Sequence, residues 1–449
     1  MIRTSLSADA LQGPLSRIER AGAELSARFP GEPTGRQPVH TVYGGAHLFR
    51  ADTARKLGDL ALRAMAEHAP AAAALASVMG LGDNEIAGAV HARVLEKLRR
   101  EPVEDLRIDF EDGYGARPGA EEDGHAEGAA REVARGMAAG SLPPFLGIRI
   151  KALDAELRGR GIRTLDIFLS SLVAEAGPAL PAGFVVTLPK VASAEQVAAL
   201  ADVLDLLEGA LGLAPGAVRL EIMVETPQAI VGPGGEVPLR GMVEAGRGHC
   251  VAAHFGAYDY TASLGVTAAH QRLTHAACDF ARHTMQVSLA GTGVRLSDGA
   301  TNVLPVPVHR APPGALSAAQ VEENRRAVHA AWRLHHDHIR YALERGYYQG
   351  WDLHPAQLPA RYAAVYAFFL EALEPAAARL RSFVEKAAQA TLAGAVFDDT
   401  ATGQGLLNFF LRAVAAGAMT WDEAAARAGL SPEELRGRSF AAIAAGRRP

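Results

Sequence analysis

The chain of 449 residues is 49% hydrophobic and 21% charged, with a formal net charge of −5. This balance is typical of a folded protein with a sizeable core and argues against a disordered chain. The scattered Lys and Arg argue against a nucleic-acid groove, and no run of about 18 apolar residues predicts a membrane span. Because the N-terminus lacks the apolar core of a signal peptide, we expect a cytoplasmic protein.

Two cysteines, Cys250 and Cys278, are too few for a disulfide framework, and neither has a neighbour at metal-binding spacing. We expect both to be buried thiols.

In chain order, residues 1–38 predict an N-terminal helical extension. Short apolar or β-branched runs then alternate with helical patterns, as in βα units that build a parallel sheet. We predict eight strands, of which the seventh competes with residues 302–306: 39–43, 106–110, 146–150, 184–188, 218–224, 251–255, 293–296 and 350–354.

Helical periodicity fills the gaps between these strands. One predicted helix opens with a capping box at Ser193 and Gln196, and residues 113–140 read as a long loop with its own helix. The helices predicted between strands span 51–67, 165–176, 194–211, 268–286 and 318–345.

We therefore predict an α/β fold, a closed (β/α)₈ TIM barrel over residues 39–360, with a doubly wound sheet as the structural alternative. Residues 361–449 should form an α-helical C-terminal region, with helices at 356–390, 403–416, 420–428 and 431–445. Because these helices are apolar and not needed to close a barrel, we expect them to pack against a second copy in a homo-oligomer.

Polar residues follow several of the predicted strands, and in such a barrel the carboxyl ends of the strands meet at one mouth, where catalytic groups gather. These residues are Asp109, Glu111 and Asp112 after strand two, Arg149 at the end of strand three, Lys190 after strand four, Glu225 and Thr226 after strand five, Asp259 after strand six, and His354 after strand eight.

Several acids at one mouth need neutralising, because buried unpaired charges cost several kcal/mol each. Mg²⁺, or Mn²⁺, with oxygen ligands would do this, and Glu225 and Asp259 are placed to be the metal ligands. Zinc is disfavoured because no His pair or Cys lies at the predicted strand ends.

Six segments resemble, in order, the strand-end motifs of the citrate lyase beta-subunit and malyl-CoA lyase superfamily, which includes the class II hydroxy-oxo-acid aldolases. They are LRIDFEDG (106–113), GIRIK (147–151), LPKV (188–191), IMVET (222–226), FGAYDYTASLG (255–265) and LHPAQ (353–357).

This resemblance implies a Mg²⁺-dependent lyase that makes or breaks a carbon–carbon bond through the enolate of a small keto acid. It implies Glu225 and Asp259 as metal ligands and Arg149 as the group that holds the keto-acid oxygens. Asp109, Glu111 and Asp112 match an acidic motif beside the metal, where Asp112 could act through water as acid or base.

Each of these residues also has a structural reading. Arg149 could pair with Glu111 or Asp112; Lys190 could pair with the acidic cluster or form a Schiff base with a keto acid. Thr226 could line the pocket or cap a helix, and His354 could be a structural residue of the rim or a base.

Two departures from the family bear on the substrate. The segment 40–46 lacks the arginine and proline of family members that bind coenzyme A, so use of a thioester is open. Asp398 and Asp399 are only a loose counterpart of the acidic residue that such lyases insert into a neighbouring subunit. A thioester hydrolase, a malate synthase-like condensing enzyme and a non-catalytic assembly subunit remain alternatives.

Overall fold

The protein is described by a computed structural model over residues 5–33, 35–82, 84–310, 315–385, 391–393, 396–398 and 400–446. Eight parallel strands form one sheet in the order β7-β6-β5-β4-β3-β2-β1-β8. A parallel bridge between Ala300 and Trp351 closes the ring between β7 and β8. The strands are β1 His40–Gly45, β2 Asp105–Asp109, β3 Phe145–Arg149, β4 Val185–Leu188, β5 Arg219–Val224, β6 Cys250–Phe255, β7 Arg295–Ser297 and β8 Gly350–Asp352.

The predicted (β/α)₈ barrel is therefore the fold. A doubly wound sheet would reverse its strand order at a switch point, whereas here consecutive strands are neighbours. The competing segment 302–306 forms no strand. Cys250 and Cys278 are buried free thiols, as expected.

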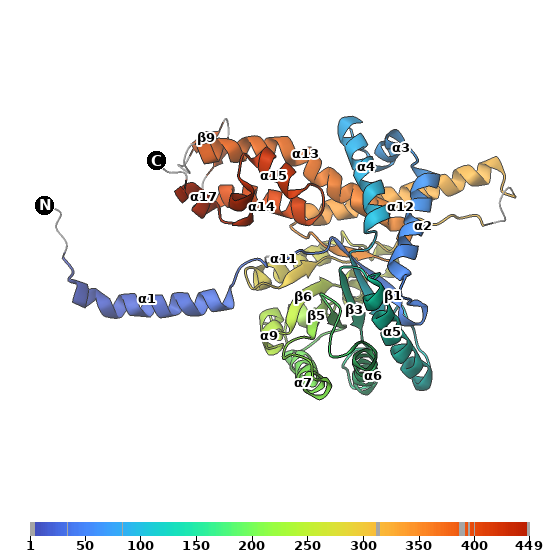
Figure 1. Cartoon of the computed structure of the whole chain (residues 1–449), viewed down its shortest axis with the longest axis horizontal. Helices are drawn as coiled ribbons and strands as arrows, with labels where there is room; N and C mark the ends of the chain where they lie inside the picture. Colours follow the sequence, from blue (N-terminus) through green and yellow to red (C-terminus); the bar gives the residue numbers. More distant parts are fainter. Residues whose placement is uncertain are drawn as a thin grey trace.

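Helices surround the strands, with α5, α6, α7 and α9 on one side and α2, α4, α12 and α13 on the other (Figure 1). The capping box of Ser193 and Gln196 starts α7 as predicted. The helices up to β8 are α2 Thr53–His68, α3 Ala72–Met79, α4 Asn84–Arg100, α5 Gly119–Ala139, α6 Arg158–Ala176, α7 Ala194–Leu211, α8 Pro227–Ile230, α9 Leu239–Ala245, α10 Ala257–Ser263, α11 Ala276–Leu289 and α12 Ala318–Glu344, with 3-10 turns η1 Ala46–Leu48 and η2 Ala268–His270.

Two helical predictions differ from the structure. The single helix expected over 268–286 is η2 followed by α11, because the His275 side chain accepts a hydrogen bond from the Ala277 amide and starts a new helix there. The helices α3 and α4 were not predicted; α3 ends at Gly80, whose φ of 69° ends the helical run.

The C-terminal region is mostly helical, as predicted. Its elements are η3 Pro355–Gln357, α13 Leu358–Glu385, β9 Thr391–Ala393, β10 Val396–Asp398, α14 Thr400–Ala415, α15 Trp421–Ala428, α16 Pro432–Arg436 and α17 Phe440–Gly446. The helix expected over 431–445 is two helices, because Arg438 between them adopts a left-handed φ of 56°. Residues 386–390 and Asp399 lie outside the described residues, and only the backbone of Asp398 is described.

The apolar faces of these C-terminal helices are covered within the chain. Leu407 and Phe410 of α14 are fully buried, in the same hydrophobic core that contains α13 and the barrel helices. They therefore do not supply the reason for self-association that the sequence suggested, and an oligomer remains a prediction.

The predicted N-terminal helix is α1 Ala8–Arg28, which extends away from the barrel (Figure 1). Among the described residues, no helix combines the length and apolarity that a bilayer span requires.

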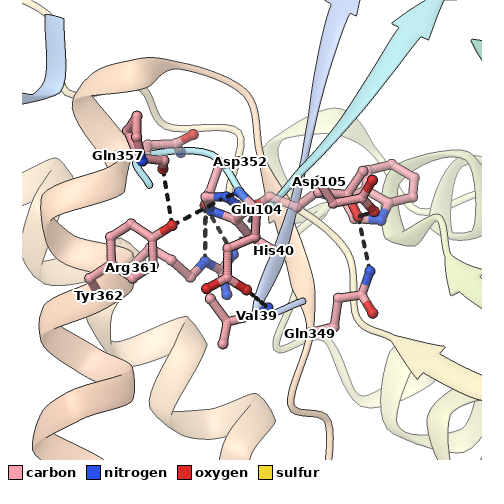
Figure 2. A network of polar contacts seen from close by, with 12 residues as sticks. Val39, His40, Glu104, Asp105, Gln349, Asp352, Gln357, Arg361 and Tyr362 are labelled. Atoms are coloured by element: carbon pink, nitrogen blue, oxygen red, sulfur yellow. Dashed lines mark hydrogen bonds and ion pairs between the residues drawn. The ribbon is translucent and has the colours of Figure 1, made fainter. Parts of the chain in front are cut away.

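A buried polar network joins β1 and β8 to the long C-terminal helices. Asp352 at the end of β8 accepts hydrogen bonds from His40 Nδ1 at 2.7 Å, from His335 Nε2 at 2.8 Å and from Arg361 Nη2 at 3.0 Å. Figure 2 shows His40, Asp352 and Arg361 gathered in this way. The His40 Nε2 accepts from the Glu104 amide at 3.0 Å, so its proton sits on Nδ1. This network fixes the position of the two strands behind the mouth.

Candidate active site

Arg149 and Asp109 form the centre of the mouth, at the ends of the neighbouring strands β3 and β2. Arg149 donates from Nε to Asp109 Oδ1 at 2.7 Å and from Nη2 to Asp109 Oδ2 at 2.5 Å, a bidentate ion pair. The amides of Glu111 and Gly113 also donate to Asp109. Burial alone would lower the pKa of Arg149, but Asp109 outweighs it and raises the pKa. Arg149 is therefore a fixed cation.

The third guanidinium nitrogen of Arg149, Nη1, is directed at other groups. It lies 3.2 Å from Glu111 Oε2 and 3.8 Å from Asp112 Oδ2. The Arg149 guanidinium also stacks on Tyr43, 4.8 Å from the ring centroid. The pairing with Glu111 considered from the sequence is thus present, but Asp109 is the principal partner.

Lys190 joins the same acidic cluster. Its ammonium pairs with Glu111 and lies 3.4 Å from Asp112 Oδ1. Burial raises the pKa of Glu111. Burial opposes ionisation of Asp112 too, but Arg149 and Lys190 outweigh it and lower its pKa. The ion pair predicted between Lys190 and the acidic cluster is confirmed.

Glu225 follows β5 and is almost completely buried, with 1% of its surface exposed. Its Oε1 accepts from the Lys190 backbone amide at 2.7 Å. Lys190 has a left-handed φ of 52°, uncommon for a residue other than glycine, and this conformation accompanies the contact. On the other side Gly256 packs so closely that a β-carbon there would lie 2.5 Å from Glu225 Cβ.

Asp259 is the third residue of α10, directly beyond β6, and lies at the same mouth as Glu225. Burial and, next, the negative charge of Asp259 raise the pKa of Glu225 to about 8. Among the described residues, Glu225 Oε2 and the Asp259 carboxylate have no hydrogen bond or ion pair. Two neighbouring carboxylates without a cation fit the oxygen-rich site that Mg²⁺ uses.

Beneath the mouth lies a polar layer that the sequence reasoning missed. Arg107 of β2 pairs with Asp105 and with Glu221, and the Tyr43 hydroxyl lies 3.3 Å from His254 Nδ1. Strand alternation could have found it, because residues two apart point to the same face. Asp105, Arg107 and Asp109 share a face of β2, and Glu221 shares one with Glu225 across β5.

Thr226 and His354 both serve as helix caps. The Thr226 hydroxyl donates to the Val191 carbonyl at 2.7 Å and accepts from the Ala229 amide. His354 Nδ1 accepts from the Ala356 amide at 3.2 Å, and burial lowers its pKa. In the described part of the chain, no hydrogen bond or ion pair links either residue to Arg149 or Glu225.

A second group of possible ligands, Asp205, Glu208 and His249, lies on α7 and just before β6, at the opposite end of the barrel. Glu208 accepts from the amides of Gly216 and Val218, and His249 Nδ1 lies 2.7 Å from the Val218 carbonyl. These bonds explain the cluster as a fastening of the loop after α7.

Solved structures similar to this chain share its fold. A citrate lyase from Burkholderia xenovorans LB400 is 20% identical with a TM-score of 0.55, over 75% of this chain and 91% of that chain. A Haloferax volcanii malate synthase, solved as a magnesium/glyoxylate complex, is 16% identical with a TM-score of 0.46, over 91% and 96%. A search of curated proteins gave no match.

A family model described as "Domain of unknown function (DUF6986)" matches residues 18–443. This match includes the barrel, every mouth residue discussed above and nearly all of the C-terminal helices. The chain belongs to that family.

Proposed function

We propose that this protein is a Mg²⁺-dependent carbon–carbon lyase of the aldolase type, which cleaves or forms a hydroxy acid through the enolate of a small keto acid. The observation that carries the proposal is the pair Glu225 and Asp259, two neighbouring carboxylates with no cation between them. The fold similarity to a citrate lyase agrees with this class of reaction.

Glu225 and Asp259 would hold the metal through carboxylate oxygens. Mg²⁺ commonly takes one or two protein carboxylates and leaves other positions to water and substrate, and Mn²⁺ accepts similar ligands. The bound ion would supply positive charge that polarises a carbonyl and stabilises an enolate. Lys190 supports this arrangement by donating its backbone amide to Glu225 Oε1.

Arg149 would bind the oxygens of the keto acid. Asp109 holds two of its three guanidinium nitrogens, so the guanidinium is oriented before substrate arrives. Nη1 faces Glu111 and Asp112 at more than 3 Å and can exchange them for a carboxylate or enolate oxygen. Asp112, 58% exposed and with a lowered pKa, is suited to accept a proton through water near neutral pH.

Lys190 is poorly suited to form a Schiff base. Burial would lower its pKa, but Glu111 outweighs burial and raises it, so the amine stays protonated. A protonated amine is not a nucleophile. We therefore assign Lys190 to positioning Glu111 and Glu225.

The first test is metal binding by titration calorimetry. Wild-type protein should bind Mg²⁺, and Glu225→Gln should lose that binding, whereas the exposed control Glu236→Gln should keep it. Equal binding by all three proteins would refute the metal site.

The second test is activity. Release of pyruvate, oxaloacetate or glyoxylate from a panel of hydroxy acids, with and without coenzyme A thioesters, should stop with chelator and return with Mg²⁺ or Mn²⁺. Glu225→Gln should lose activity on the order of a hundredfold or more. Free coenzyme A as the product would instead indicate a hydrolase or condensing enzyme. A borohydride-stable adduct of pyruvate on Lys190, with activity indifferent to chelator, would refute the mechanism.

A further inference from the structure

The helix α1 exposes an apolar stripe. Leu15, Ile18 and Leu25 are 51%, 66% and 59% exposed, and Leu11 is half-buried. Together with Gly22 these positions recur every three or four residues, so they lie on one face of the helix. We call Leu11, Leu15, Ile18 and Leu25 the α1 stripe.

The sequence of α1 does not favour a free-standing helix. Gly13, Pro14 and Gly22 lie inside it, and relative to alanine they cost about 1, 3 and 1 kcal/mol in a helix interior. Protein helices gain most of their stability from packing an apolar face. Because the stripe is exposed, α1 needs a surface on which to pack.

A second unpartnered apolar surface lies on the side of the barrel, around α8, α10 and α11. Val231, Leu264, Phe280 and Val287 are exposed there; we call them the Phe280 patch. The patch includes a hollow of about 420 Å³ in which Gln228 is the one polar lining residue. A monomer rarely leaves such a contiguous apolar surface to water.

The stripe cannot reach the patch of its own chain as the helix is anchored. Arg28 pairs with Glu244 at 2.6 Å, and the Arg240 guanidinium lies 4.1 Å from the centroid of the Phe29 ring. The Gly31 amide donates to the Gly291 carbonyl at 2.9 Å. These contacts hold the last turn of α1 at the end of α11, from which α1 runs away from the barrel (Figure 1).

We propose that the α1 stripe of one chain docks on the Phe280 patch of a second copy of the same chain. Each chain carries one stripe and one patch, so a reciprocal exchange of α1 satisfies all four surfaces in a twofold dimer. The apolar chemistry of both surfaces and their equal number in one chain identify the second copy as the occupant.

The first experiment is sedimentation velocity on full-length protein at micromolar concentration. Wild-type protein should sediment as a dimer of the 47.2 kDa chain. The variants Leu15→Glu/Ile18→Glu and Phe280→Glu should be monomeric, with the dissociation constant raised at least about 100-fold by loss of the buried apolar groups. All the substituted side chains are exposed, so folding should be kept.

Matched controls carry the same added charge elsewhere. Ser16→Glu/Ala23→Glu places two carboxylates on the opposite face of α1, and Leu206→Glu changes an apolar residue of α7 that is 73% exposed. Both controls should remain dimeric. A monomeric wild-type protein, or a dimer that survives in the stripe variants, would refute the proposal.

Contact between chains is tested directly by mixing two single-cysteine variants. Ile18→Cys protein mixed with Phe280→Cys protein should give a disulfide-linked dimer on oxidation, whereas Ser16→Cys with Phe280→Cys should not. The native cysteines are buried and should not interfere. Cross-linking of Ile18→Cys to itself, without cross-linking to Phe280→Cys, would show that two α1 helices pair with each other and would overturn the assignment to the patch.

Discussion

Replacing Gly256 by alanine tests how the mouth holds Glu225 without changing any proposed ligand. The new methyl would lie 2.5 Å from Glu225 Cβ and 2.3 Å from Glu225 Oε2. Carbon atoms in contact prefer about 3.5–4 Å, so one side must move by about 1 Å. The Gly256 φ of −97° suits alanine, so steric overlap is the whole effect.

The overlap should cost about 1–3 kcal/mol of unfolding free energy, as overpacking in a core does. A displacement of about 1 Å at a reactive centre can also cost on the order of 100-fold in rate. We therefore expect Gly256→Ala to unfold at lower urea concentration and to bind Mg²⁺ more weakly than wild type.

Gly209→Ala is the matched control. Gly209 lies in α7, where an added β-carbon meets nothing within 4 Å. Alanine there should stabilise the helix by up to about 1 kcal/mol and leave Mg²⁺ binding unchanged. If Gly256→Ala unfolds like wild type, the close packing against Glu225 is wrong. If it is destabilised but binds Mg²⁺ normally, the carboxylate position does not govern the metal site.

Three further changes have expected outcomes. Asp352→Asn removes the charge that faces three buried cationic or histidine groups and should lower the unfolding free energy by about 3–5 kcal/mol in urea titrations; a loss below about 1 kcal/mol would contradict this. Burial lowers the pKa of His338 to about 4, so this group's stabilisation is present above pH 6.5 and is lost between about pH 6.5 and 4, by about 3 kcal/mol; His338→Gln should flatten the slope of unfolding free energy over that range, and an unchanged slope would count against it. Asp109→Asn should destabilise the fold and weaken keto-acid binding by releasing Arg149, whereas Asp112→Asn, at an exposed position, should leave stability within about 0.5 kcal/mol in the same titrations.

The barrel could be predicted because its strands are short apolar runs in a regular alternation with helices, and local pattern suffices for that. The strand-end rule likewise located Asp109, Arg149 and Glu225 at one mouth. Partner choice could not be predicted, since Asp109, Glu111 and Asp112 are all within reach of Arg149 in sequence terms. Side-chain geometry gives Asp109 the bidentate contact and leaves Glu111 to Lys190.

Other features depend on long-range packing that the sequence pattern does not record. The left-handed backbone of Lys190 has no glycine to signal it, and it appears only when the amide is seen to meet Glu225. The apolar character of the C-terminal helices was visible, but not which surface covers it. The structure buries Leu407 and Phe410 within the chain and leaves the stripe on α1 uncovered instead.

The buried carboxylates of the barrel differ from one another in a way that singles out Glu225. Asp109, Glu221 and Asp352 each face a guanidinium, and where a shift is resolved it is downward: burial opposes ionisation, but arginine outweighs it and lowers the pKa of Glu221 to about 2. Glu225 is as deeply buried but receives one backbone hydrogen bond and faces another carboxylate, so its pKa rises to about 8. A chain that supplies arginine to three such acids and withholds it from the fourth leaves that acid to a cation from solution, which the Mg²⁺ titration of Glu225→Gln measures directly.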